Sequence, residues 1–96
     1  MKQKIGFIAE VKVNFPGADF WLVRKGSEAS VGQPVEFFNR EFIGLRFNAK
    51  VAVARYYFYV MQIYYQTGVF ERLAKGTLQL KHITVDDVIE LDAHPS

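Results

Sequence analysis

The chain has 96 residues, of which 50% are hydrophobic and 16% aromatic, and it carries a formal net charge of +2 without any cysteine. This length predicts a single domain over residues 1–96, and the hydrophobic content suffices for a buried core and argues against a disordered chain. The absence of cysteine excludes a disulfide framework and a thiolate metal site.

The N-terminal part of the chain has the patterns of two β-strands. The stretch IAEVKVNF, residues 8–15, alternates between apolar and polar residues, which predicts a strand with one buried face. Pro16-Gly17 is typical of a turn. The following run FWLV, residues 20–23, is continuously apolar, which predicts a strand covered on both faces. We expect these two strands to pair as a hairpin.

Residues 24–34 are small and polar, which predicts a loop. Two further strands are expected in VEFF, residues 35–38, and in EFIGLRF, residues 41–47. In the second of these, Ile43, Leu45 and Phe47 share one face, because successive side chains of a strand point to opposite sides.

From residue 51 the period changes to that of a helix. The segment VAVARYYFYVMQIYYQ, residues 51–66, is apolar nearly all round, and Arg55, Gln62 and Gln66 form one polar stripe together with Tyr59. A helix of this kind should be covered on most sides by the sheet or, in addition, by a second chain. Gly68 should interrupt the helix, and residues 69–75 should resume it as a second short segment.

Gly76 is placed to end this second segment in the left-handed conformation, with Arg72 and Lys75 complementing the helix dipole. Thr84 followed by Asp87 resembles a capping box and predicts one helical turn. The stretch IELDA, residues 89–93, is expected to form a final short strand. Together these elements predict an α+β fold with a small antiparallel or mixed sheet packed against a buried, tyrosine-rich helix.

The first residues lack the long apolar run and the small-residue cleavage pattern of a signal peptide. Arg55 and Gln62 break the apolar run between residues 51 and 65, so it does not reach the length of a membrane span. We therefore expect a soluble, cytoplasmic protein with no membrane partner.

The small net charge hides an asymmetry along the chain. Residues 85–96 hold four acids and neither lysine nor arginine, so the rest of the chain carries twelve bases against six acids. A basic body suits a polyanionic partner such as nucleic acid. The alternative, on charge alone, is an ordinary solvated surface with an excess of lysine.

No pattern of catalytic or metal-binding residues stands out. His82 and His94 have no third ligand patterned around them, which favours a chance pair over a metal site. Asp86 and Asp87 are adjacent and diverge by about 100° on a helix, which suits helix capping better than acid–base catalysis. No serine lies in a nucleophile elbow, and no loop has the GK[ST] ending of a phosphate cradle. We predict that the protein is not an enzyme and has no cofactor.

Four stretches follow one another in an order and spacing typical of a known family. They are DFWLVRKGS at residues 19–27, VGQP at residues 31–34, the tyrosine-rich segment at residues 56–70, and KGTLQLKHI at residues 75–83. Over residues 19–91 the chain thereby resembles a target-recognition domain of the specificity subunit of type I restriction-modification systems. Family members are longer and continue into spacer helices, so the chain resembles a short, freestanding version.

This resemblance implies a non-enzymatic module that binds duplex DNA and reads bases in the major groove, while a separate methyltransferase subunit performs the chemistry. A methyltransferase subunit is therefore an implied partner. Lysines and arginines would contact phosphates, and Ser27 or Gln79 would reach a base edge. The DNA-binding candidates lie in two segments and are Arg24, Lys25, Ser27, Arg72, Lys75, Thr77, Gln79 and Lys81.

Alternatives stay open for several of these residues. Gly76 and Thr77 equally suit a plain helix stop. Gln79 and Lys81 also suit an exposed strand face. The second functional hypothesis is a protein-interaction or accessory protein of a restriction-modification system, which keeps the fold and forms a homodimer without reading DNA, since a wide apolar helix invites a second copy.

Overall fold

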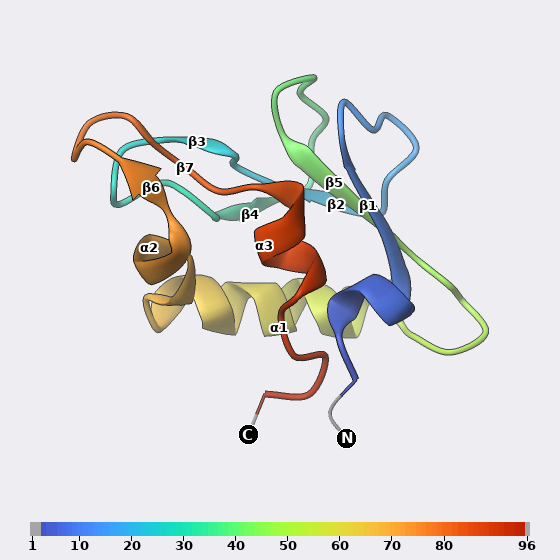
Figure 1. Ribbon diagram of the computed structural model, residues 1–96. Helices are drawn as coiled ribbons and strands as arrows, with labels where there is room; N and C mark the ends of the chain where they lie inside the picture. Colours follow the sequence, from blue (N-terminus) through green and yellow to red (C-terminus); the bar gives the residue numbers. More distant parts are fainter. Residues whose placement is uncertain (1–2, 96) are drawn as a thin grey trace.

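A computed structural model of the chain describes residues 3–95 as two antiparallel sheets, three α-helices and a short N-terminal 3₁₀ helix (Figure 1). Met1, Lys2 and Ser96, the ends of the predicted domain, lie outside the described residues. The α+β class expected from the sequence is confirmed, as is the antiparallel arrangement of the strands.

The larger sheet has the strand order β1-β5-β2-β4. Its strands are β1 (Ala9–Val13), β2 (Phe20–Leu22), β4 (Pro34–Val35) and β5 (Ile43–Phe47). The expected alternation of β1 and the full burial of β2 are confirmed. The predicted strand at residues 35–38 is reduced to Val35, because the chain leaves the sheet at Glu36 and exposes Phe37 and Phe38.

The expected hairpin between β1 and β2 is wrong. β5 lies between them, pairing along all five of its residues with β1 and along three with β2. The reason is that Ile43, Leu45 and Phe47 are all buried. A strand with so apolar a face removes the most apolar surface from water when it lies at the centre of the sheet.

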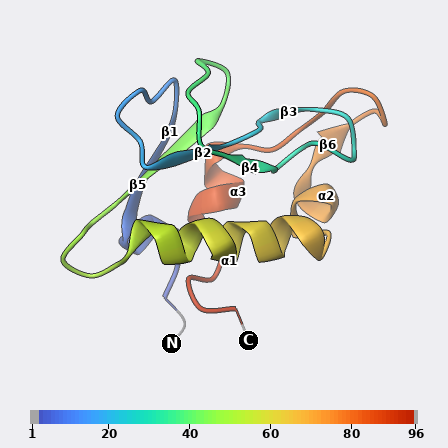
Figure 2. The ribbon, with the colours of Figure 1, turned by 180° about the vertical axis from the view of Figure 1, so that it is seen from behind.

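Helix α1 (Ala54–Gln66) crosses the molecule beneath the sheets (Figure 2). It begins three residues later than the apolar pattern, because the Asn48 carbonyl accepts the backbone N–H groups of Val51 and Ala52 in a turn. Its buried face presents four side chains to the core, which are Tyr57, Val60, Met61 and Tyr64. The opposite face is open in the monomer, so the expected coverage on most sides is not met within this chain.

The exposed face of α1 is also wider than the predicted polar stripe. Arg55, Tyr59 and Gln66 are exposed as expected, whereas Gln62 is half-buried. Two apolar side chains, Tyr56 and Ile63, join the exposed face.

Helix α2 (Val69–Leu73) follows Gly68, whose φ of 82° breaks the path of α1, so the predicted interruption is confirmed. The expectation for Gly76 is wrong, because α2 ends at Leu73 and Ala74 is already extended. Gly76 instead lies in β6 (Lys75–Gly76) with φ 119°, where a Cβ would stand 2.2 Å from the Leu80 carbonyl oxygen. Glycine is required there to let the chain turn back on itself.

The smaller sheet has the order β3-β7-β6, formed by β3 (Lys25–Gly26), β7 (Lys81–His82) and β6. The loop expected over residues 24–34 therefore contains one short strand. Helix α3 (Val85–Ile89) follows β7, and both hydrogen bonds of the predicted capping box between Thr84 and Asp87 are present.

The final strand expected at residues 89–93 is wrong. Ile89 ends α3, and the rest of this segment forms only an isolated antiparallel bridge between Asp92 and Lys4, next to the 3₁₀ helix η1 (Ile5–Phe7). Two backbone hydrogen bonds, from Ile5 to the Leu91 carbonyl and from Ala93 to the Gln3 carbonyl, tie the two ends together. No helix within residues 3–95 has the length and apolarity that a bilayer crossing requires.

Candidate nucleic-acid interface

The smaller sheet joins the two segments that carry most of the predicted DNA-binding residues. β3 comes from the first segment, and β6 and β7 come from the second, about fifty residues later. The three strands lie side by side above α2 in both ribbon views (Figures 1 and 2). Residues that are distant in the sequence thus share one surface.

The register of this sheet places three basic side chains in one line. Lys25 of β3 and Lys75 of β6 both stand opposite His82 of β7. Side chains of directly paired residues lie on the same face of a sheet, so these three form what we call the basic row. All three are exposed, and no ion pair occupies either lysine in the described part of the chain. His82 was missed because only the strand register reveals it.

Lys81 lies on the opposite face of the same sheet, between Gly26 and Gly76. It is close to the carboxylate of Glu71, which shares a hydrogen bond with Glu28. That hydrogen bond, followed by the charge of Glu28 and by desolvation, raises the pKa of Glu71, while Lys81 and Arg72 act in the opposite direction. Lys81 thus interacts with Glu71 and does not belong to the basic row.

Residues 77–80, which we call the tip loop, connect β6 to β7 and carry two predicted candidates. The carbonyl and the hydroxyl of Thr77 accept hydrogen bonds from the Leu80 N–H, at 3.3 and 3.2 Å. The Glu28 N–H donates to the Leu78 carbonyl at 3.1 Å. Gln79 is exposed between Leu78 and Leu80, which are 66% and 75% exposed. The alternating sequence TLQL is typical of a strand with one buried face, so it did not indicate that both leucines face solvent.

The three remaining candidates are held by contacts within the protein. The Arg24 guanidinium donates to the backbone carbonyl of Glu41 at 2.8 Å and to its carboxylate at 2.7 Å. The Ser27 hydroxyl lies 3.1 Å from that of Ser30. Arg72 donates to the Thr67 carbonyl at 3.2 Å. These side chains would have to give up a contact before reaching a ligand, whereas the basic row would not.

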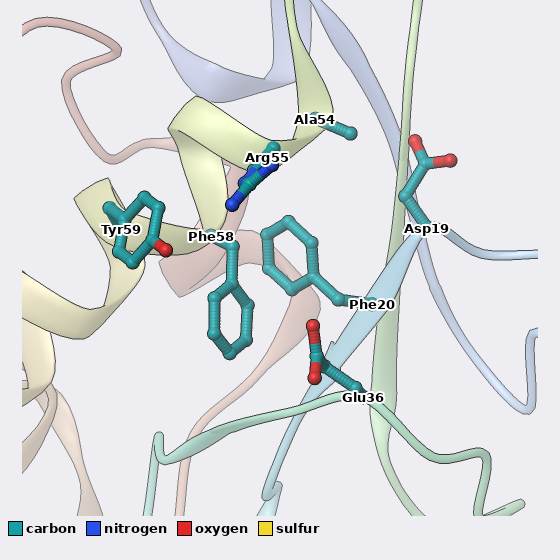
Figure 3. Close-up of a pocket in the computed structure, with 7 residues that line it drawn as sticks. All are labelled: Asp19, Phe20, Glu36, Ala54, Arg55, Phe58 and Tyr59. Carbon is teal, nitrogen blue, oxygen red and sulfur yellow. The ribbon is translucent and has the colours of Figure 1, made fainter.

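A separate pocket of about 530 Å³ lies between the start of β2 and the first turns of α1 (Figure 3). Phe20 and Phe58 form its apolar part, and Arg55 and Glu36 approach Phe20 from opposite sides. One oxygen of Asp19, at the rim, accepts the backbone N–H of Phe47 at 2.7 Å and so supports the sheet. Of the described residues that line the pocket, Asp19 has a side-chain hydrogen bond, and its partner is a backbone N–H outside the lining and not a second lining side chain.

Within residues 3–95, no three histidine, aspartate or glutamate side chains are grouped as ligands for a metal ion. Comparison of the chain with protein-family models, with curated proteins and with solved structures gives no match. The basic row and the tip loop are therefore the surfaces of this chain that indicate a function.

Proposed function

We propose that the protein is a non-enzymatic DNA-binding module of the target-recognition type that serves type I restriction-modification systems. The observation that supports it most is the basic row. The two segments of DNA-binding candidates each contribute a lysine to it, and among residues 3–95 neither lysine forms an ion pair with an acid on this exposed face. Such a face suits a polyanion.

The spacing of the lysines fits a duplex. Lys25 and Lys75 lie on the two outer strands, so their backbones are separated by two strand spacings, roughly 10 Å. The grooves of B-DNA are about 6 and 12 Å wide, and a lysine side chain is long and flexible. The two ammonium groups can therefore contact phosphates on both sides of a groove, with His82 between them. Phosphate contacts of this kind fix the position of a protein on DNA.

Fluorescence anisotropy with a labelled random duplex tests this proposal. Affinity should fall steeply with salt, because each phosphate contact adds about −0.9 to the slope of log K against log salt. Lys25→Ala/Lys75→Ala should weaken binding and make the slope shallower by about 2. Arg40→Ala/Lys50→Ala removes the same charge from two exposed loops outside the basic row and serves as the control. A flat salt response, or equal losses in the two double variants, would contradict the proposal.

We further propose that the partners of the protein are duplex DNA and a methyltransferase subunit. Both would be met in the cytoplasm. Co-purification with a candidate methyltransferase subunit, with and without duplex DNA, checks the second partner. A complex that forms only through DNA and disappears on nuclease treatment would argue against direct docking.

A second candidate function is favoured by the open face of α1. Tyr56, Tyr59 and Ile63 are 52%, 56% and 49% exposed and follow a spacing of three and four residues, which aligns them along one side of the helix. Such a seam suits packing against a second copy. This function would be that of an accessory protein of a restriction-modification system that dimerises without reading DNA.

Light scattering after size-exclusion chromatography tests the second candidate. The accessory function requires a dimer that Tyr59→Glu/Ile63→Glu converts to a monomer, while Gln79→Glu, on the exposed tip loop outside α1, leaves it intact. A monomer at every concentration would exclude it. The charge change acts by placing a carboxylate in an apolar contact, which is unfavourable without a partner.

A further inference from the structure

The tip loop exposes two large apolar side chains within only four residues. Leu78 and Leu80 are 66% and 75% exposed, although both belong to a residue type that is usually buried. The tip loop, which carries both leucines, projects from the end of the smaller sheet and away from the core (Figure 1). Two exposed leucines separated by a single residue at a projecting end are typical of a contact surface.

The loop is also held in one shape. The Leu80 N–H is bonded to both oxygens of Thr77, and the Leu78 carbonyl is fixed by the Glu28 N–H. Gly76 lets the chain close over the Leu80 carbonyl, where any Cβ would collide. A loop fixed in this way loses little conformational freedom when it binds, so the leucines are preorganised for a ligand.

The charges around the loop indicate which ligand fits. The basic row lies at its base on one face of the sheet. On the other face, the charges of Lys81 and Arg72 lower the pKa of Glu71, against the effect of its hydrogen bond to Glu28. Gln79, which carries both a donor and an acceptor, is exposed between the two leucines. The surface therefore combines cations on one face with one amide and two apolar side chains at the tip, while Glu28 and Glu71 lie near Lys81 on the other face.

We infer that the tip loop enters the minor groove of duplex DNA, with Leu78 and Leu80 wedged between base pairs and Gln79 facing the base edges, so that the duplex bends. Proteins that bind this groove combine basic and amide side chains with apolar wedges that partly unstack a base step. This inference rests on the proposed function. It moves Gln79 from the major groove, where the resemblance implies base reading, to the minor groove, and it adds the deformation of the DNA.

Energy transfer between dyes at the two ends of a short duplex tests the inference. Binding of the wild-type protein should raise the transfer efficiency, because minor-groove wedges kink DNA by about 20–90°. Leu78→Ala/Leu80→Ala should lose that rise while anisotropy still reports salt-dependent binding. A minor-groove ligand such as netropsin should displace the wild-type protein from an A·T-rich duplex.

A matched control is Val51→Ala/Val53→Ala, which trims two aliphatic side chains that are 62% and 67% exposed in the loop before α1. This variant should bend DNA like the wild type. Circular dichroism on all variants checks that they are folded.

The outcomes separate the inference from the proposed function. Binding that depends on Lys25 and Lys75 without bending, or bending that survives the leucine substitutions, would overturn the inference and leave the function standing. No DNA binding at low salt would remove both. Leucine-dependent binding to vesicles of phosphatidylserine and phosphatidylcholine, without binding to DNA, would likewise overturn both and assign the tip loop to membranes.

Discussion

Replacing Gly32 with alanine should destabilise the protein strongly, for two reasons that can be measured apart. Gly32 has φ +87°, a conformation that L-residues with a side chain rarely adopt. An added Cβ would also stand only 2.4 Å from the Cβ and Cγ of Phe70, which is fully buried. The turn cannot easily move, because the Gly32 N–H is bonded to the Val23 carbonyl at 2.8 Å. The ring of Phe70 cannot easily move either, because it is fully buried.

The expected magnitude follows from these two terms. The left-handed conformation costs about 1–2 kcal/mol for a residue with a Cβ. Overpacking of a buried site adds about 1–3 kcal/mol. The sum, roughly 2–5 kcal/mol, is a large part of the 5–15 kcal/mol that stabilises an ordinary domain. For a chain of this size it corresponds to a fall in Tm of about 10 °C or more.

Two other glycines separate the terms. Gly68 has φ +82°, but its Cβ would meet only the end of the flexible Arg72 side chain at 3.2 Å, so Gly68→Ala should cost about 1–2 kcal/mol. Gly17 has no such φ and no atom nearer than 3.8 Å, so Gly17→Ala should be neutral or stabilising by up to about 1 kcal/mol. Urea denaturation followed by Trp21 fluorescence measures all three. The reasoning fails if Gly32→Ala is no more destabilising than Gly68→Ala.

Two more predictions concern helix capping and pH. Thr84→Ala removes the side chain that accepts the Asp87 N–H and should lower the free energy of unfolding by about 1 kcal/mol, measured in urea, with Asp86→Ala as a milder control. The hydrogen bond to Glu28 raises the pKa of Glu71, which means that the folded protein favours the protonated Glu71 carboxyl. The stability that this hydrogen bond contributes is therefore present at low pH and is lost as the pH rises through the raised pKa of Glu71. Glu71→Gln should therefore raise Tm near neutral pH and leave it unchanged in acid; an unchanged Tm at both would refute this.

Elements with strong periodic patterns could be predicted from the sequence. β1 has an unbroken alternation, β2 is continuously apolar, and α1 has a buried face spaced at the helical repeat. The capping box of α3 was also recognisable, because the two residues that form it are only three positions apart. In each case the signal lies within the element itself, so no knowledge of its neighbours was needed.

Pairing between elements was not predictable in the same way. The β1–β2 hairpin was expected because a turn connects those strands, yet β5 takes the central place through a buried face that only the assembled sheet reveals. Gly76 has the positive φ that was expected, but a helix end and a tight loop require the same conformation. A single residue therefore could not distinguish them.

The site was only partly foreseen for a related reason. A resemblance of segments selects residues by their place in the sequence, whereas a strand sends alternate residues to opposite faces. Lys75 and Lys81 belong to the same predicted group but lie on opposite faces of the smaller sheet, and His82 joins the basic row from outside that group. Strands of two residues carry no periodicity, so this register was not contained in the pattern.

The smaller sheet has a consequence for the order in which the protein folds and opens. β3 and β7 are separated by more than half of the chain, so their pairing closes a long loop. Each strand contributes only two residues to the pairing, one exposed and one half-buried. Such an element should form after the larger sheet and exchange its amide hydrogens first. A polyanion that contacts Lys25 and Lys75 at once would hold the two outer strands together. Binding would then slow hydrogen exchange in this sheet more than elsewhere in the molecule.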